Sequence, residues 1–472
     1  MMARIEAFAR QAPGRPAFIR DGVPVRYGEV ARLVRATAAQ LARAGIAPGD
    51  AVGVTLDDTW AHILVSLALI RLGCRQVGLS ARDPLPLRAA LAQRLGLVAV
   101  VGRVPEDAPA GAALLRPDLE AIAAGRDEAA SLPPIGRGEM VMATSGTTGR
   151  PKLMVADEVA LLAQAELFAG FGGVFLHVPS FDANHSRRLT FRSLLAGGTE
   201  VLAGAMPPRD LARFVARHGV TRVHVAPPAL AALQEALPDG AWPGDACIVT
   251  TGTRVPQAAR RALQARLGCR LHVLYGTTEA GMVSVAGPEH HDSHPDSVGP
   301  VLPGVEVEVV DEDGRALPAG EEGLLRFRSA AVVRGYLDDP EAQAQAFDRG
   351  WFRPGDVGRL LPDGELLVAG RADDRMTLGV IKIFPAEIEA VAEGFPGLLD
   401  CAAFAVPSGH FGEIPMLAVV AGEGFDAAAL MAHCRDRLGL RAPRKVVRVP
   451  SLPRNAQGKV LRRALADAAV AP

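Results

Sequence analysis

Short apolar runs alternate with helix-like repeats along most of the chain, and this alternation limits the folds that are open to it. Apolar side chains recur at helical spacing between residues 30 and 41. A turn at residues 48–50 separates them from AVGVTL, residues 51–56, which has the composition of a buried strand, and a second apolar helix pattern covers residues 61–72. Strand-like runs keep recurring as far as residue 274. Such alternation is typical of α/β layered domains.

The pattern changes after about residue 296. The run VEVEVVDEDG alternates with a period of two and ends in a turn, and GLLRFRS and GELLVAG are similar, which predicts a β-rich subdomain at about residues 297–370. Helix patterns return in PAEIEAVAEG and DAAALMAHCRDRL. The 472 residues exceed the roughly 250–300 that one core supports. We expect an α/β fold with a large N-terminal domain, residues 1–370, and a small mobile C-terminal α+β domain, residues 371–472.

Composition excludes several classes of function. Lys and Arg number 51 against 52 Asp and Glu, so the chain lacks the basic excess expected for binding nucleic acid or an anionic membrane. The five cysteines are scattered without a CxxC pair, which favours a reducing compartment over a disulfide framework. Charged residues interrupt the N-terminal segment where a signal peptide needs an apolar core. We therefore expect a cytoplasmic protein.

The strongest chemical signal is TSGTTGRPK, which directly follows an apolar segment. Glycines let backbone amides curl around an anion, hydroxyls add donors, and a lysine adds positive charge, so the run predicts a grip on the phosphates of a nucleotide. The spacing is not that of a Walker loop. The candidate phosphate-binding residues are Thr144, Ser145, Gly146, Thr147, Thr148, Gly149 and Lys152.

This run resembles the phosphate-loop signature of the ANL superfamily, which comprises acyl- and aryl-CoA synthetases, adenylation domains of nonribosomal peptide synthetases, and luciferases. YGTTEAG, residues 275–281, resembles the second signature. There the resemblance implies that Tyr275 packs on adenine, Thr278 contacts the α-phosphate and Glu279 holds Mg²⁺, a role that suits one carboxylate beside phosphate oxygens. The resemblance also assigns to the adenine and ribose site Gly252, Thr253, Arg254 and Gly276.

Three further segments continue the resemblance in the same order. WFRPGDVGRL implies that Asp356 accepts hydrogen bonds from both ribose hydroxyls. GRADDRM resembles the hinge between the domains, with Arg371 on the ribose or phosphates and Asp373 as the residue whose backbone torsions change. PRNAQGKVLRR resembles the C-terminal signature, whose lysine, here Lys459, reaches the α-phosphate and the attacking carboxylate.

The resemblance implies ATP-dependent activation of a small carboxylic acid with Mg²⁺ as cofactor. An acyl-adenylate and pyrophosphate form first, and a thiol then takes the acyl group. The first hypothesis is an acyl- or aryl-CoA ligase with CoA as acceptor. The second is a stand-alone enzyme that loads an acyl, aryl or amino acid onto the phosphopantetheine of an acyl carrier protein. A luciferase-like oxidase shares the same motifs. A regulatory protein with a dead site would require the loss of Lys152, Glu279 or Lys459, and all three are present.

The acyl pocket departs from the usual pattern. Asp182 resembles the aspartate that binds the ammonium group in amino-acid-activating relatives, while Asn184 and His185 suit an aryl or hydroxylated acid, and Gly281 completes the predicted pocket. The pair Arg187 and Arg188 is interpreted as a solvated helix face in preference to a site for a second carboxylate.

Near the hinge, relatives carry a glycine at the position of Val380, whereas here the glycine is Gly379; Lys382 matches the basic residue of the relatives. This region lies along the thiol tunnel of CoA ligases. Two other polar segments are interpreted as solvent-exposed. EHHDSHPD, residues 289–296, matches no zinc spacing and is predicted to be a surface loop. The basic run at residues 435–448 is predicted to be a solvated face that could attract CoA phosphates or an acidic carrier protein.

Overall fold

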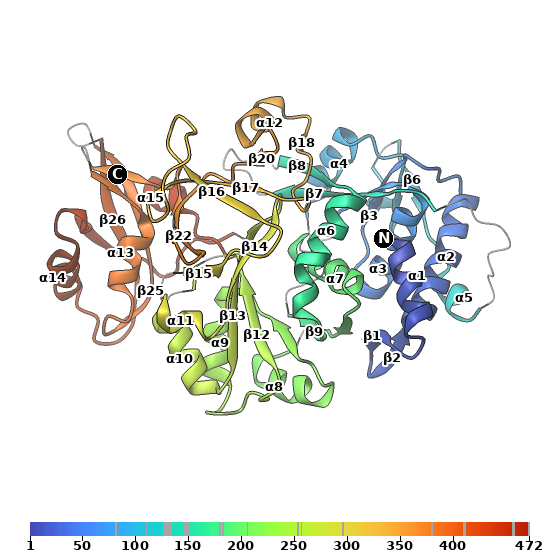
Figure 1. Ribbon diagram of the computed structural model, residues 1–472, viewed down its shortest axis with the longest axis horizontal. Helices are drawn as coiled ribbons and strands as arrows, with labels where there is room; N and C mark the ends of the chain where they lie inside the picture. Colours follow the sequence, from blue (N-terminus) through green and yellow to red (C-terminus); the bar gives the residue numbers. More distant parts are fainter. Residues whose placement is uncertain are drawn as a thin grey trace.

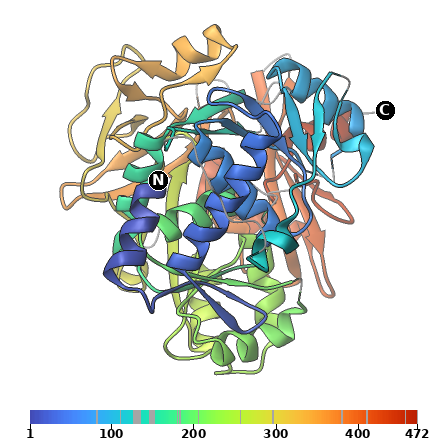
Figure 2. The same cartoon turned by 90° about the vertical axis from the view of Figure 1, so that its right-hand side faces the viewer.

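The computed structural model describes the chain except for residues 81–82, 110, 126–134, 145–151, 179–180, 182–183, 205, 253, 256, 295–296, 379–380, 409–411, 456–457 and 471–472. The N-terminal part fills the right side and centre of Figure 1, and the C-terminal domain lies at the left. In Figure 2 the N-terminal helices face the viewer and the C-terminal domain lies behind them. Among the described helices, none is long and apolar enough to cross a membrane.

Two mixed sheets with parallel centres form the main body of the N-terminal domain. Sheet A has the order β14-β13-β12-β11-β9-β10-β1-β2 and sheet B the order β18-β8-β7-β4-β3-β5-β6. The strands of sheet A are β1 (Pro16–Arg20), β2 (Val23–Arg26), β9 (Val174–His177), β10 (Thr199–Leu202), β11 (Arg222–His224), β12 (Cys247–Thr251), β13 (Arg270–Thr277) and β14 (Gly281–Ala286). Those of sheet B are β3 (Ala51–Val54), β4 (Arg75–Gly78), β5 (Ala99–Val101), β6 (Ala113–Leu115), β7 (Glu139–Thr144), β8 (Lys152–Ala156) and β18 (Tyr336–Leu337).

Helices connect and cover these strands as the alternation predicts. They are α1 (Met2–Gln11), α2 (Tyr27–Arg43), α3 (Thr59–Leu72), α4 (Leu85–Arg94), α5 (Leu119–Ala123), α6 (Glu158–Phe168), α7 (Asn184–Leu195), α8 (Pro208–Arg217), α9 (Pro227–Ala236) and α10 (Gln257–Leu267). Helix α3 is apolar all round, and its residues from Ala61 to Leu72 are buried. Asp58 caps its first turn by accepting a hydrogen bond from the Ala61 amide at 2.6 Å, and Gly73 ends it in the left-handed conformation.

Helix α7 is buried although it carries several arginines. Arg187, Arg188 and Arg192 are only 4%, 5% and 4% exposed. The Arg187 guanidinium reaches sheet B, where it lies against the backbone of Gly78 so closely that a Cβ there would meet it at 1.2 Å. The helix also packs on α6 and on strands of sheet A. The prediction of a solvated face at Arg187 and Arg188 is therefore wrong, because both sheets and a neighbouring helix cover the side chains.

An antiparallel sheet C follows, as the period-two pattern predicts. Its order is β15-β22-β21-β17-β20-β19, with β16 paired to β17. The strands are β15 (Ser297–Pro300), β16 (Glu306–Val310), β17 (Gly323–Arg328), β19 (Phe347–Asp348), β20 (Trp351–Phe352), β21 (Asp356–Leu360) and β22 (Glu365–Arg371), and α12 (Pro340–Ala346) precedes β19. One strand of this region leaves its neighbours: β18 pairs with β8 and becomes the edge of sheet B.

The C-terminal domain is built on sheet D. Its strands are β23 (Met376–Leu378), β24 (Ile381–Ile383), β25 (Leu398–Ser408), β26 (Gly412–Ala421) and β27 (Lys445–Arg448), and its helices are α13 (Pro385–Ala392), α14 (Ala427–Leu438) and α15 (Arg462–Val470). Separate apolar clusters occupy the two faces of this sheet, one including Ile388 and Leu430 and the other including Phe404 and Leu465. The predicted α/β fold with a small α+β C-terminal domain is confirmed.

Segment 289–296 differs from its prediction. His290–Ser293 form the short helix α11, and His291 is buried, with its Nδ1 2.8 Å from Oε1 of Gln264. Burial is the main cause that lowers the pKa of His291 to about 4. His290 reaches the buried carboxylate of Glu365 at 2.7 Å. The prediction of a surface loop is wrong for His291, which packs against α10, whereas Glu289 and Ser293 are exposed.

One buried tyrosine ties α2 to the end of α7. The Tyr27 hydroxyl lies 2.7 Å from the Gly198 carbonyl oxygen and 3.0 Å from that of Leu194, and its side chain is fully buried. We predict that Tyr27→Phe lowers the free energy of unfolding by about 1–3 kcal/mol, because the buried Gly198 carbonyl loses the hydroxyl, whereas the Leu194 carbonyl keeps the Gly197 amide at 3.1 Å. Thr37→Val in the same helix is the control and should cost less, since Thr37 bonds only a carbonyl of its own helix. Urea denaturation that finds the two variants equally stable would contradict this.

Candidate active site

A cavity of about 1130 Å³ lies where the N-terminal domain, sheet C and the C-terminal domain meet. Its walls come from chain segments far apart in the sequence. The turn after β13 contributes Thr278 and Glu279, sheet C contributes Phe352 and Arg371, and the last residues of the chain contribute Lys459. The cavity thus gathers residues from several of the motifs singled out in the sequence.

The turn between β13 and β14 holds the YGTTEAG residues in place. Only glycine fits at position 276, because a Cβ there would lie 2.0 Å from the Gly281 carbonyl oxygen across the hairpin. Gly281 adopts a left-handed φ of +78° at the start of β14. The Thr277 hydroxyl accepts a hydrogen bond from the Ala280 amide at 2.9 Å. These constraints turn Thr278 and Glu279 toward the cavity, which both residues line.

Tyr336 lies between Glu279, the predicted Mg²⁺ ligand, and Lys152 of the predicted phosphate site, and the sequence reasoning missed it. Its hydroxyl donates to Oε1 of Glu279 at 2.8 Å, and Nζ of Lys152 lies 5.2 Å from the centre of its ring. Burial and the nearby Glu279 carboxylate both raise the pKa of Tyr336, so the hydroxyl remains a donor. The signal that could have identified Tyr336 is rarity, because the chain has only three tyrosines.

A second tyrosine orients the predicted ribose carboxylate. The Tyr275 hydroxyl donates to Oδ2 of Asp356 at 2.5 Å, and Arg371 lies 3.7 Å from Oδ1. Burial raises the pKa of Asp356, while the hydrogen bond from Tyr275 and the charges of Arg371 and Lys459 oppose that rise. Because a carboxylate accepts up to about four hydrogen bonds, Asp356 retains capacity for hydroxyls of a ligand.

Lys459 sits on a tight turn that enters the cavity from the C-terminal domain. Its amide donates to Oδ1 of Asn455 and its carbonyl accepts from the Asn455 amide, both at 2.9 Å. Gly458 takes a left-handed φ of +81° to close the turn. The Lys459 Nζ lies 4.0 Å from Oδ2 of Asp374, just after the predicted hinge residue. Asp373 itself pairs with Arg371 at 3.0 Å.

The other predicted site residues have mixed outcomes. Gly252 and Gly281 line the cavity. Arg254 does not: its guanidinium extends instead to the Ala386 carbonyl of α13, 3.5 Å away. Residues 145–149, Thr253 and Asp182 lie outside the described residues, as do the side chains of Thr144, Asn184 and His185.

The residues present fit a magnesium ion held together with phosphates. The Glu279 residue is only 8% exposed, and one of its carboxylate oxygens is fixed by Tyr336. Within the described part of the chain, the other oxygen accepts no hydrogen bond. A single oriented carboxylate that faces a cavity suits Mg²⁺, which keeps several waters and takes further ligands from a nucleotide.

Comparison with known proteins agrees with this geometry. A family model described as AMP-binding enzyme matches residues 5–337, and the model of the C-terminal domain of such enzymes matches residues 387–459. The chain belongs to the AMP-binding enzyme family. The resemblance to the ANL superfamily is thereby confirmed.

Several curated members of the AMP-binding enzyme family align over almost the whole chain. A 2-hydroxy-7-methoxy-5-methyl-1-naphthoate–CoA ligase from Streptomyces carzinostaticus is 30% identical over 98% of this chain and 91% of its own length. A feruloyl-CoA synthase from an Amycolatopsis species is 31% identical over 96% of each chain. Among solved structures, ATP-bound MatB from Rhodopseudomonas palustris is 25% identical, covers 99% of both chains and has a TM-score of 0.87.

The contact between Tyr336 and Glu279 can be tested by removing the hydroxyl. We predict that Tyr336→Phe raises the Mg²⁺ concentration needed for half-maximal activity by about 10–100-fold, because the Glu279 carboxylate, the predicted Mg²⁺ ligand, loses the group that orients it. The measurement is a Mg²⁺ titration of ATP–pyrophosphate exchange at saturating ATP. Tyr275→Phe serves as a control that should leave the Mg²⁺ dependence unchanged, since Tyr275 contacts Asp356 instead.

Proposed function

We propose that this chain activates a carboxylic acid as an acyl-adenylate, with release of pyrophosphate, and then transfers the acyl group to the thiol of CoA. The observation that supports this most strongly is the position of Lys459. A cation from the end of the chain lines the same cavity as Tyr275, Thr278 and Glu279. The CoA ligases among the relatives support the same reaction class.

The first step must bring two anions together. A carboxylate attacks an anionic phosphate poorly unless positive charge neutralises both and holds them in line. Lys459, Arg371 and Lys152 line the cavity and supply this charge from three sides. When bound at Glu279, Mg²⁺ adds the charge that offsets pyrophosphate as it leaves. Asp356, oriented by Tyr275, is placed to accept hydrogen bonds from the ribose.

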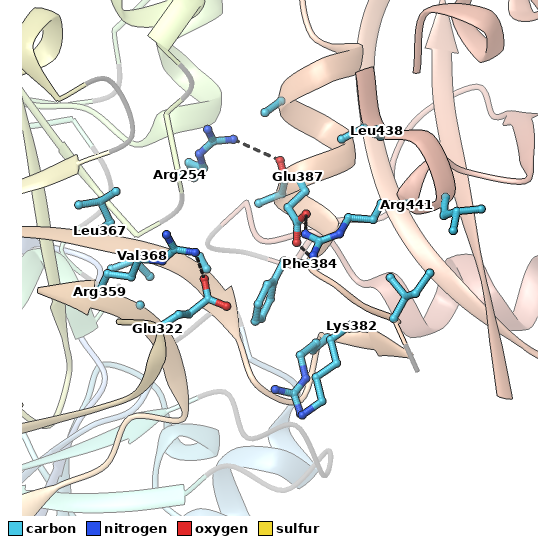
Figure 3. A pocket seen from close by; sticks show the side chains of 17 residues that line it. Arg254, Glu322, Arg359, Leu367, Val368, Lys382, Phe384, Glu387, Leu438 and Arg441 are labelled. Atoms are coloured by element: carbon cyan, nitrogen blue, oxygen red, sulfur yellow. Dashed lines mark hydrogen bonds and ion pairs between the residues drawn. The ribbon is translucent and has the colours of Figure 1, made fainter. Parts of the chain in front are cut away.

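The second step needs a different arrangement of the domains. A further cavity of about 970 Å³ lies between them and is lined by Arg254, Arg359, Lys382, Phe384 and Arg441 (Figure 3). Among the described residues, none lines both this groove and the active-site cavity. Gly379 and Val380, in the segment that resembles the thiol tunnel of CoA ligases, lie outside the described residues, but Lys382 of the same segment lines the groove. We therefore infer that residues 371–472 rotate about Asp373 before thiol transfer.

The direct contacts across the groove are consistent with such a rotation. Arg254 reaches the Ala386 carbonyl at 3.5 Å, and Lys382 lies 3.4 Å from Oε1 of Glu312, with both partners of that ion pair more than half exposed. Exposed ion pairs contribute at most about 1 kcal/mol each. Breaking these contacts therefore adds little to the cost of a domain rotation.

The proposed acceptor is CoA, and the phosphopantetheine of a carrier protein is the alternative. The run at residues 435–448 is largely exposed, as its sequence predicts, and offers cations to either acceptor. The relatives named as CoA ligases favour CoA. ATP–pyrophosphate exchange with aliphatic, aromatic, dicarboxylic and amino acids tests the first step. Faster AMP release on adding free CoA identifies the acceptor, and a preparation inactive with every acid would overturn the proposal.

Mutation of Lys459 can show whether the lysine acts in adenylation but not in thioester formation. We predict that Lys459→Ala lowers adenylation by roughly 10²–10³-fold or more, because a charge donor to the transition state is lost. Thioester formation from preformed acyl-AMP should survive, since that step does not require the lysine. Both half-reactions are measured on the same preparation. Pyrophosphate release at the wild-type rate would show that Lys459 has no part in the chemistry.

A further inference from the structure

The wall of the active-site cavity formed by α7 is unusually polar for a site that receives the carbon skeleton of an acid. Ser186, Arg188 and Arg192 line it from the helix, and His224 lines it from the end of β11. All four residues are less than 6% exposed. Apolar side chains, among them Leu189, Leu274 and Met282, line the same cavity. The cavity can therefore accept a carbon skeleton and also bears buried polar groups.

Arg192 is a buried cation held only by a neutral group. Its Nε and Nη2 donate to Oε1 of Gln164 at 3.1 and 2.6 Å. The Gln164 amide is fixed in this orientation because its Nε2 donates to the Ala331 carbonyl at 2.9 Å. Within the described part of the chain, no carboxylate pairs with Arg192. Burial of an ion without a counter-ion is unfavourable, so an anion supplied by a ligand is expected at this position.

The neighbouring groups add further positive charge around Arg192 and supply no negative charge. Arg188 lies one helical turn before Arg192, on the same face of α7. It donates to the Thr278 carbonyl at 2.8 Å and interacts favourably with Glu279. Burial, together with the charge of Arg188, lowers the pKa of Arg192. His224 cannot supply a compensating negative charge, and burial keeps it neutral by lowering its pKa to about 3.

Gly281 lies beside Arg192 on the wall of the cavity. A Cβ at that position would lie 3.5 Å from Nη2 of Arg192 and 3.0 Å from Cγ of Gln164, so the glycine keeps the approach open. Arg188 contacts the turn that carries Thr278, where the reacting carboxylate must lie. Arg192 is four residues further along α7, about 6 Å along the helix axis. A second group bound there would lie at the opposite end of a short acid.

We propose that Arg192 is a specificity residue that binds a second carboxylate of the substrate, so that this enzyme prefers dicarboxylic acids over the corresponding monocarboxylic acids. This inference rests on the proposed function and refines its acyl site. One carboxylate of the diacid is adenylated beside Lys459, and the other pairs with the guanidinium of Arg192 in a water-poor pocket. Recognition of a planar carboxylate by a guanidinium is strong because it is charge-assisted and can be bidentate.

The test uses acids matched in size that differ only in the second carboxylate. Glutarate is compared with pentanoate, and terephthalate with 4-methylbenzoate, by ATP–pyrophosphate exchange with the full-length enzyme. We expect at least one diacid to exceed its partner by 10-fold or more in kcat/KM. In Arg192→Gln this preference should disappear, through a KM for the diacid raised by about 10²-fold. Arg192→Lys should restore part of it.

The variant Gln164→Leu distinguishes recognition of the second carboxylate by Arg192 from a structural role of Arg192 in holding α6 and α7 together. It removes the hydrogen bond between α6 and α7 but keeps the cation, so the ratio of diacid to monoacid activity should persist. If Arg192→Gln lowers both acids of each pair equally, Arg192 is only structural and the inference is wrong. Exchange with monoacids but no preference for any diacid would overturn the inference and leave the proposed function standing. Exchange with no acid at all would overturn both.

Discussion

Electrostatic repulsion between two anions is the constraint around which this cavity is built. A carboxylate and a phosphate must approach each other, and no single segment of the chain carries enough positive charge to allow it. The protein places Lys152 at the start of β8 in sheet B, Arg371 at the end of β22 in sheet C and Lys459 on a turn of the C-terminal domain. Because these cations belong to different parts of the chain, the site is complete only when the domains are closed. In the proposed mechanism, the position of the C-terminal domain therefore controls the reaction.

The tyrosines show how buried hydroxyls hold such a site together. Each of the three donates to an oxygen far away in the sequence: Tyr27 to the end of α7, Tyr275 to Asp356 and Tyr336 to Glu279. A phenol buries a large apolar ring while its hydroxyl keeps a directed hydrogen bond. The two carboxylates are thus oriented before any ligand arrives, which reduces the entropy that nucleotide binding has to overcome.

Much of the fold could be predicted from the sequence because periodicity is local. The helix pattern at residues 30–41 lies within α2, and the alternating run before residue 311 contains β16. What failed depended on tertiary contacts. Arg187 and Arg188 have the composition of a solvated face, yet two sheets enclose α7, and no local pattern reveals that enclosure. Tyr336 was missed for the same reason, since only the pairing of β18 with β8 brings it to Glu279.

The excursion of β18 into sheet B also limits how this protein can be divided. A fragment that ends where sheet C begins would lack the strand that covers β8, and the exposed backbone of β8 would become a template for pairing with other chains. Such a fragment would also lack Tyr336, so Glu279 would lose its hydrogen-bond donor. Attempts to express the α/β body alone, or to exchange sheet C between relatives, should therefore keep residues 336–337 with the N-terminal portion. The pieces of this protein that can be exchanged are therefore not continuous stretches of sequence, because β18 follows strands of sheet C in the chain but belongs to sheet B.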